Sequence, residues 1–212
     1  MKPHISALSI LTISALFAPA AEADILKVPS ATFPTIASAV AAAHSGDTIQ
    51  IGPNNAVGSG GTYFENIVVP NTLTGLHFKG ANVAWDGGAN DNNLTFTGPN
   101  DGVTVEGFAF TNGLSHVVIT GNDATITRCQ SIRSRNAAAL QITGNFAKVT
   151  NVHVEGGVGD GIRISGTDAT IDQCVIDGRT GPGVDLLAAD RASVSKCKSS
   201  GCDVGILAAE MI

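Results

Sequence analysis

Three side chains in the second half of the sequence could act on an acidic substrate. They are Asp160, Arg163 and Asp185. The Arg163 guanidinium could neutralise an anionic group, and a neighbouring carboxylate could transfer a proton if its pKa suited that task. The alternative is an ordinary ion pair across two strands, which contributes roughly a few tenths of a kcal/mol to stability. Either interpretation requires a fold that brings the three residues together.

The sequence around these residues repeats with a period of about 22–23 residues, which is a length typical of solenoid proteins. The phrase apolar-x-Ile-Thr/Ser-Gly recurs at 117–121, 140–144 and 162–166. Three columns keep one register: Phe96, Ile119, Ile142, Ile164 and Leu186; Ile126, Val149, Ile171 and Val194; and Cys129, Val152, Cys174 and Cys197. The repetition therefore predicts units that stack one on the next.

Each repeat contains three short stretches in which apolar and polar residues alternate. In one repeat they are 140–143, 147–150 and 152–154, separated by polar or glycine turns. Alternation of this kind indicates strands that bury one side. Leucine-rich repeats have a similar length, but their Leu/Asn signature is absent. The sequence therefore predicts an all-β, right-handed parallel β-helix with three strands and about 22–23 residues per coil.

The beginning of the chain differs from the repeats. Residues 1–23 predict a secretory signal peptide, because a basic start precedes a short apolar run and the small-residue site Ala21-Glu22-Ala23. Residues 24–212 then form the β-helix domain, with a cap at 24–52 and coils at 62–212. Between Pro34 and Gly46 we expect a short amphipathic α-helix across the open end of the stack.

These features predict a secreted or periplasmic protein without a membrane span. The C-terminal end is expected to be uncapped, so that the chain either self-associates there or lacks a further region. The net charge is −6, and no Lys/Arg cluster occurs, which argues against nucleic-acid binding. Among the four cysteines, Cys197 could form a disulfide with Cys174 or Cys202, or all could be buried thiols that act as small apolar residues.

The stretch from Phe33 to Val69 resembles the N-terminal cap of the pectin-lyase-like superfamily of right-handed β-helices. The residues that carry the resemblance are Ile36, Gly46, Asp47, Thr48, Ile49, Gly61, Thr62, Tyr63 and Glu65. The repeats from Leu94 onward are similar to its coils. Pectin methylesterases, polysaccharide lyases, epimerases and periplasmic repeat proteins share this cap. The resemblance therefore implies a fold, and the activity has to be argued from a site.

The resemblance also implies that sugar chains bind on the strand that holds Ile-Thr-Gly. Its outward residues form two ladders: Thr97, Thr120, Thr143 and Ser165; and Thr95, Val118, Gln141, Arg163 and Asp185. We expect a polysaccharide to contact Thr97, Thr120, Gln141, Thr143 and Ser165, although hydroxyl ladders also suit any strand surface. In the turns before this strand, Arg133, Arg135 and Arg179 could line a groove for an acidic polymer or be solvated.

Two functions follow from these expectations. Esterase members of the superfamily use aspartates beside an arginine, and lyase members use a basic residue with Ca²⁺ held by carboxylates. Asp160, Arg163 and Asp185 could serve either chemistry, with Asp160 and Asp185 as calcium ligands, on a polymer such as pectate or alginate. The other function is a truncated or degenerate relative that binds extracellular or cell-wall polysaccharide. We favour the latter, because the chain is short and no evident acid/base set occurs.

Overall fold

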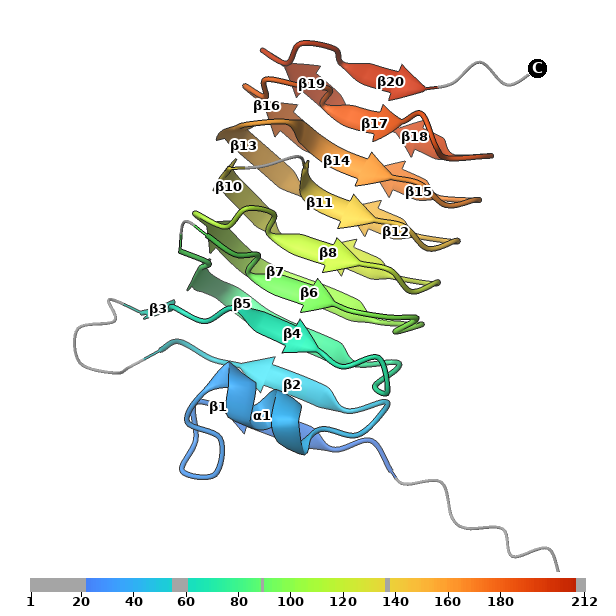
Figure 1. The fold of residues 1–212 in the computed structure, drawn as a ribbon. Coiled ribbons are helices and arrows are strands. Elements are labelled where there is room, and N and C mark those ends of the chain that lie inside the picture. Colours follow the sequence, from blue (N-terminus) through green and yellow to red (C-terminus); the bar gives the residue numbers. More distant parts are fainter. Residues whose placement is uncertain (1–21, 55–60, 89, 136–137, 209–212) are drawn as a thin grey trace, which may run out of the picture.

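The computed structural model describes residues 22–54, 61–88, 90–135 and 138–208. The predicted signal peptide, residues 1–23, lies outside the described residues except for its last two. The described chain contains one helix and twenty strands, which wind into a stack of coils (Figure 1). Within this described part, no helix is long and apolar enough to cross a membrane.

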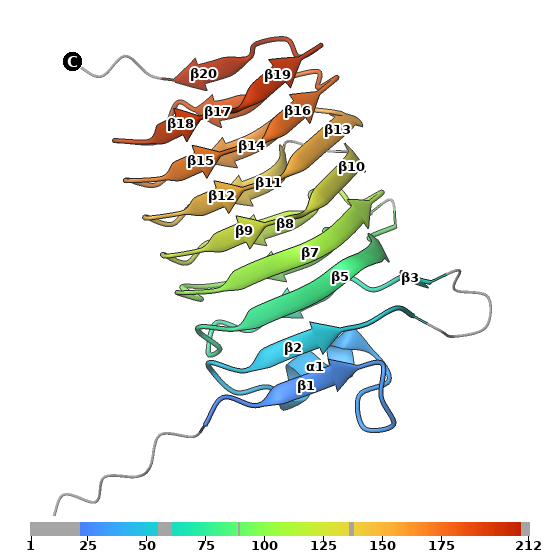
Figure 2. The same ribbon diagram turned by 180° about the vertical axis from the view of Figure 1, so that it is seen from behind.

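The strands form three faces of the stack, and all pair in parallel between coils. Face 1 is a separate sheet (Figure 1) that contains β4 (Ile67–Val69), β6 (Leu94–Phe96), β8 (Val117–Ile119), β11 (Ala138–Ile142), β14 (Asp160–Ile164), β17 (Val184–Leu186) and β20 (Ile206–Ala208). The long strands β5 (His77–Asp86) and β7 (Thr104–Thr111) join faces 2 and 3 into one sheet on the opposite side (Figure 2).

The remaining strands divide between these two faces. Face 2 contains the first halves of β5 and β7 with β1 (Ile25–Val28), β2 (Thr48–Ile51), β9 (Thr125–Thr127), β12 (Lys148–Thr150), β15 (Thr170–Asp172) and β18 (Ser193–Ser195). Face 3 contains their second halves with β3 (Thr62–Tyr63), β10 (Gln130–Ser134), β13 (His153–Gly157), β16 (Val175–Asp177) and β19 (Lys198–Ser200).

The strand register confirms the predicted repeat. Leu140 is paired with Val117 on one side and with Ile162 on the other, so each strand lies one sequence repeat away from its partner. The first full coil is longer than the later ones, as the pairing of Leu94 with Ile67 shows. The right-handed parallel β-helix with three strands per coil is thus confirmed, with irregular coil length near the N-terminus.

The interior is filled by the inward residues of every coil. In the early coils they are large and aromatic: Trp85, Phe108 and Phe110 lie with ring centroids 5.5–5.6 Å apart, and Phe78 packs edge-on against Phe96. Later coils use valine, isoleucine and leucine in the columns that the sequence predicts. Burying each such side chain contributes about 1.5–3 kcal/mol, so the stack is stabilised coil by coil.

The corners of the coils hold residues in the left-handed conformation, and these also stack in register. Between faces 2 and 3 they are Arg128, Asn151, Gln173 and Lys196, with φ of 50–55°. The amide of Asn151 donates to the Asp172 carbonyl one coil further on, at 3.1 Å, so the corner satisfies its backbone while turning the chain.

The cap helix α1 (Ile36–Ala42) lies at the N-terminal end of the stack, against β1 and β2 and below β4 (Figure 1). Thr35 and Ser38 form a capping box, and the Glu65 carboxylate accepts from the amides of Ile36 (3.0 Å) and Ala37 (2.9 Å). The helix is shorter than predicted. It ends at Ala42, because Ala43 is extended, and the chain then reaches Gly46 without helical turns.

Asp47 ties this cap to the first strand. It is 2% exposed, and its carboxylate accepts from the amides of Asp24 at 2.8 Å and His44 at 2.7 Å. The aspartate of the sequence Gly46-Asp47-Thr48-Ile49 therefore has a structural role. Its carboxylate accepts hydrogen bonds from two backbone amides that would otherwise lack partners.

The four cysteines are free thiols. Cys129 and Cys174 occupy the predicted inward column, and burial raises the pKa of Cys129 to about 11 and that of Cys174 to about 12. They act as small apolar residues of the core. Cys197 and Cys202 are only half-buried, so the alternative of buried thiols applies to the first two cysteines.

Replacing Asp47 with alanine should destabilise the cap by about 2–3 kcal/mol, because two backbone amides lose a charged acceptor. Urea unfolding of Asp47→Ala measures this change. Asp91→Ala is the matched control, since Asp91 is exposed and such a change alters stability by about 0.5 kcal/mol or less. Equal stabilities for the two variants would contradict the assigned role.

Candidate functional site

The outward residues of face 1 form the ladder that the sequence predicts. Thr95 is paired with Val118, Val118 with Gln141, Gln141 with Arg163, and Arg163 with Asp185. Neighbouring strands lie about 4.8 Å apart, so each side chain has its counterpart on the next coil within reach. The ladder changes from uncharged residues to charged residues at Arg163.

Arg163 forms ion pairs with both predicted acidic neighbours. Its Nη2 lies 2.5 Å from Asp160 Oδ2, and its Nε lies 3.0 Å from Asp185 Oδ2. The first contact lacks hydrogen-bond geometry, whereas the second is a directed hydrogen bond. The structure thus brings together the three residues that the sequence singles out, with Arg163 half-buried between two carboxylates.

Asp160 is the deeper of the two acids. It is the first residue of β14, and it is 4% exposed. Burial raises the pKa of its carboxyl, and the nearby Asp185 acts in the same direction, while Arg163 opposes both. The site therefore combines a carboxyl that holds its proton to higher pH with a second carboxyl one coil away.

A calcium ion does not fit Asp160 and Asp185 as they lie. Calcium requires six to eight oxygen ligands, and here the Arg163 guanidinium already occupies the position between the two carboxylates. The described residues contain no group of three or more His, Cys, Asp or Glu arranged to hold a metal ion. We therefore derive no chemistry through Ca²⁺ at this site.

The hydroxyl ladder lies beside these charges, at the ends of the face 1 strands. The Thr97 hydroxyl donates to the Val69 carbonyl at 3.1 Å, and the Thr120 hydroxyl donates to the Gly98 carbonyl at 2.7 Å. Thr143 is exposed, and Ser165 is half-buried. The first two hydroxyls thus serve the backbone as donors and retain lone pairs for a ligand.

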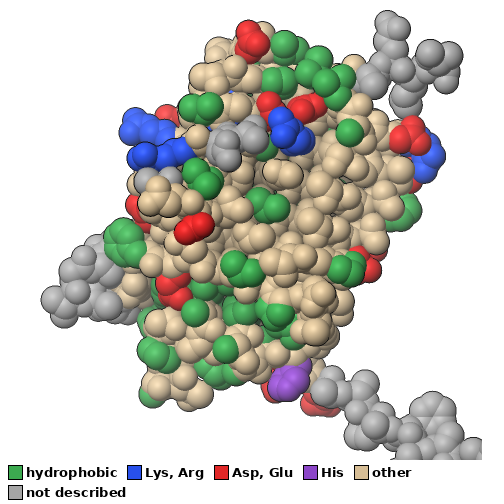
Figure 3. All heavy atoms as spheres, in the orientation of Figure 1, with side chains coloured by type: hydrophobic (Ala, Val, Ile, Leu, Met, Phe, Trp, Pro, Cys, Tyr) green, Lys and Arg blue, Asp and Glu red, His purple; other side chains and the backbone are tan. Residues whose placement is uncertain are grey.

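Arg133 and Arg135 lie at a groove where face 3 leads into face 1. Only Arg135 lies in the predicted turn, because Arg133 belongs to β10 and has a left-handed backbone with φ of 56°. The groove has a volume of about 580 Å³ and is also lined by Asn112, Ser134 and residues 156–158. Both arginines are exposed, and neither forms an ion pair with an acidic residue in the described part of the chain. Figure 3 shows blue side chains at the left edge of this view and a blue patch flanked by red on the upper part of the face.

Arg179 does not line this groove, in contrast to the prediction. It is 2% exposed, and its guanidinium donates to the carbonyls of Gly156, Val158, Gly159 and Asp160. Burial lowers its pKa to about 10. Arg179 instead fixes the turn 156–160, which carries Asp160 into position.

Sequence reasoning missed the residues that shape the groove around the arginines. Gly156 and Gly157 have positive φ, and a Cβ on Gly157 would lie 2.5 Å from Arg179 Nη1. The glycine-rich run at 156–161 was the available signal, because glycines cluster where backbones approach closely or adopt left-handed conformations.

Replacing Arg179 with methionine should destabilise the protein by about 3 kcal/mol or more, since several buried carbonyls lose their donors. Arg135→Met, on an exposed arginine that directly follows β10, is the control and should change stability by about 0.5 kcal/mol or less. Chemical unfolding at neutral pH compares them. A tolerated Arg179→Met would mean that water replaces the guanidinium.

Asp160 should make stability depend on pH in a specific direction. A carboxyl with a raised pKa stabilises the folded state below its unfolded pKa, near 3.8, and loses that contribution as pH rises through the folded value. Asp160→Asn removes this loss. The variant should therefore gain stability relative to the unmodified protein as pH rises above about 3.8, measured by unfolding at each pH. A constant difference across this range would contradict a raised pKa.

Comparison with known proteins supports the fold. Residues 138–210 match the family described as "Right handed beta helix region". This segment contains β11, β14 and β17, and so all three residues of the charged cluster on face 1. Searches of curated proteins and of solved structures find no match.

Proposed function

Since the chain is a pectin-lyase-like β-helix repeat protein, we propose that it binds an acidic polysaccharide outside the cell. The observation that carries the proposal is the groove at Arg133 and Arg135, where two exposed guanidinium groups have no described acidic partner. Guanidinium groups bind carboxylates through two parallel hydrogen bonds. Two guanidinium groups without a described acidic partner are therefore suited to binding a polymer of uronic acids.

The neighbouring face 1 supports this proposal. It offers an extended row of polar side chains at about 4.8 Å intervals, which suits a linear polymer. Gln141 and Thr143 lie on β11 and just after it, close in sequence to the arginines at 133 and 135. The protein as a whole is acidic, with a net charge of −6, so binding of a polyanion needs a local concentration of cations such as this one.

The predicted signal peptide assigns this function to the periplasm or the outside of the cell, where pectate, alginate and cell-wall polymers occur. Export is part of the proposal. It can be examined separately by asking whether the protein recovered from the producing cells begins near Asp24.

The double variant Arg133→Gln/Arg135→Gln should bind polygalacturonate about three- to tenfold more weakly. Each exposed ion contact contributes about 0.2–1 kcal/mol, and about 1.4 kcal/mol corresponds to tenfold. Affinity electrophoresis or calorimetry at low salt measures the loss. Arg191→Gln is a control, because Arg191 is paired with Asp168 and Asp190 away from the groove. Equal affinities for the two variants would overturn this assignment.

A second candidate function is hydrolysis at Asp160, Arg163 and Asp185. The observation that favours it is the cluster in which the buried Asp160 carboxyl, whose pKa burial raises, lies beside Arg163 and a second carboxyl. In this proposal Asp185 acts as base or nucleophile, Asp160 as acid, and Arg163 neutralises the uronate.

Incubation with methylated and unmethylated polygalacturonate tests this second function. Release of methanol or of reducing ends, lost in Asp185→Asn, would support it; unsaturated products detected by absorbance would instead indicate a lyase. If the unmodified protein releases nothing, the catalytic proposal fails while the binding proposal stands.

A further inference from the structure

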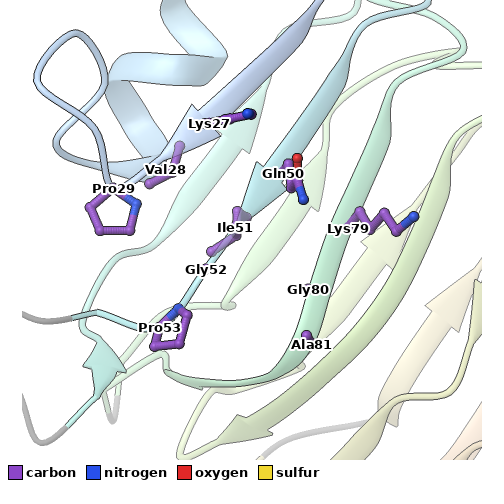
Figure 4. A pocket seen from close by; sticks show the side chains of 10 residues that line it. All are labelled: Lys27, Val28, Pro29, Gln50, Ile51, Gly52, Pro53, Lys79, Gly80 and Ala81. Carbon is purple, nitrogen blue, oxygen red and sulfur yellow. The ribbon is translucent and has the colours of Figure 1, made fainter.

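A second cationic groove lies on face 2, near the cap. It has a volume of about 440 Å³ and opens beside β1, β2 and β5, where these strands end or become irregular. Figure 4 shows its lining: Lys27, Gln50 and Lys79 on one side, and Val28, Pro29, Ile51 and Pro53 along the groove. It belongs to face 2 and its corner with face 3, not to face 1.

The polar side of the groove is a row of three side chains in register. Lys27 is paired with Gln50, and Gln50 with Lys79, on three neighbouring strands (Figure 4). A strand spacing of about 4.8 Å places the two lysine backbones roughly 10 Å apart. The row therefore presents two positive charges with an amide between them.

Neither lysine is neutralised by the described part of the protein. The strand partner of Lys79 on the next coil is Glu106, but this carboxylate is bound by Arg128 and by His77, whose Nε2 lies 3.2 Å away. Lys27 forms no ion pair with a described residue. Both lysines are exposed, so the groove offers free positive charge on a protein that is negative overall.

The groove combines features that suit an acidic sugar. Val28 and Ile51 are buried beneath it, while the rings of Pro29 and Pro53 are exposed and offer apolar surface to the C–H faces of a sugar ring. The Gln50 amide can both donate to and accept from hydroxyl groups. Two cations are too few for nucleic acid, which requires a basic stripe.

We propose that the row Lys27–Gln50–Lys79 is a second binding site for an acidic polysaccharide, in which the two ammonium groups contact carboxylates on one stretch of a uronate chain and Gln50 contacts a hydroxyl between them. The choice of polymer rests on the proposed function, whereas the site itself rests on different residues and a different face. The protein then has two polyuronate sites on different faces and different coils.

Lysine acetylation with and without oligogalacturonate, followed by mass spectrometry, tests the site directly. The ligand should slow acetylation of Lys27 and Lys79 about threefold or more, and should leave Lys148, an exposed lysine elsewhere on face 2, unchanged. A neutral oligosaccharide should protect none of them. The experiment is repeated in Arg133→Gln/Arg135→Gln, where the proposed primary groove is disabled.

The outcomes separate the two proposals. Protection of Lys27 and Lys79 in both proteins supports the second site, whatever the arginine groove contributes. Binding without lysine protection, or protection that disappears in the arginine variant, overturns the independent second site and leaves the proposed function in place. No binding to the unmodified protein overturns both.

Substitution of both lysines by glutamine provides a second test, in which binding affinity is measured. Lys27→Gln/Lys79→Gln, introduced into the arginine variant, should weaken the remaining oligogalacturonate binding about threefold or more, whereas Lys148→Gln in the same background should not. These lysines are exposed, so the substitutions leave the core unchanged. If Lys27→Gln/Lys79→Gln and Lys148→Gln weaken binding equally, the lysines attract the polymer only through the net charge of the protein, and the proposal is contradicted.

Discussion

The structure depends on one constraint: each strand must pair with its copy one coil further along. The backbone hydrogen bonds of the strands in one coil are made to the coils on either side of it. The Gly161 and Ile162 amides, for example, donate to the carbonyls of Pro182 and Gly183 on the next coil at 2.9 Å. Inward side chains must then stack in columns. A polar side chain in one coil therefore contacts the side chains at the equivalent position of the neighbouring coils. Coil length, core composition and corner conformation all follow from this stacking.

The same constraint explains which parts of the fold are predictable from sequence. Ile142 and Ile164 are direct strand partners, so their spacing in the sequence equals the number of residues in one coil. The corner at Asn151 also follows the repeat. The residues at the equivalent position of the other coils, Arg128, Gln173 and Lys196, share its left-handed conformation. The end of the cap helix was not predictable, since it depends on how Asp47 binds the His44 amide, a contact without a local sequence signal.

The candidate site is less predictable than the fold. Strand register alone placed Arg163 beside Asp185, and a short step along the same strand placed Asp160 nearby. Periodicity did not reveal that Arg179 is buried, because its burial depends on space left by Gly157 and on carbonyls gathered by the turn 156–160. His116 is comparable: it lies inside the stack against Phe110, and burial lowers its pKa to about 3. Polar residues in the interior are exceptions to the repeat, and a pattern cannot assign them a role.

The irregular strand β5 has a consequence for how such a protein gains recognition sites. Its register with β7 shifts between Lys79 and Val83, and the groove with Lys27 and Gln50 lies at that shift. An extra residue inside a regular strand would turn every following side chain to the wrong side, whereas a bulge or a longer corner absorbs it. New surfaces on this scaffold can therefore evolve by changes in coil length at a few tolerant positions, while the columns of the core remain as they are.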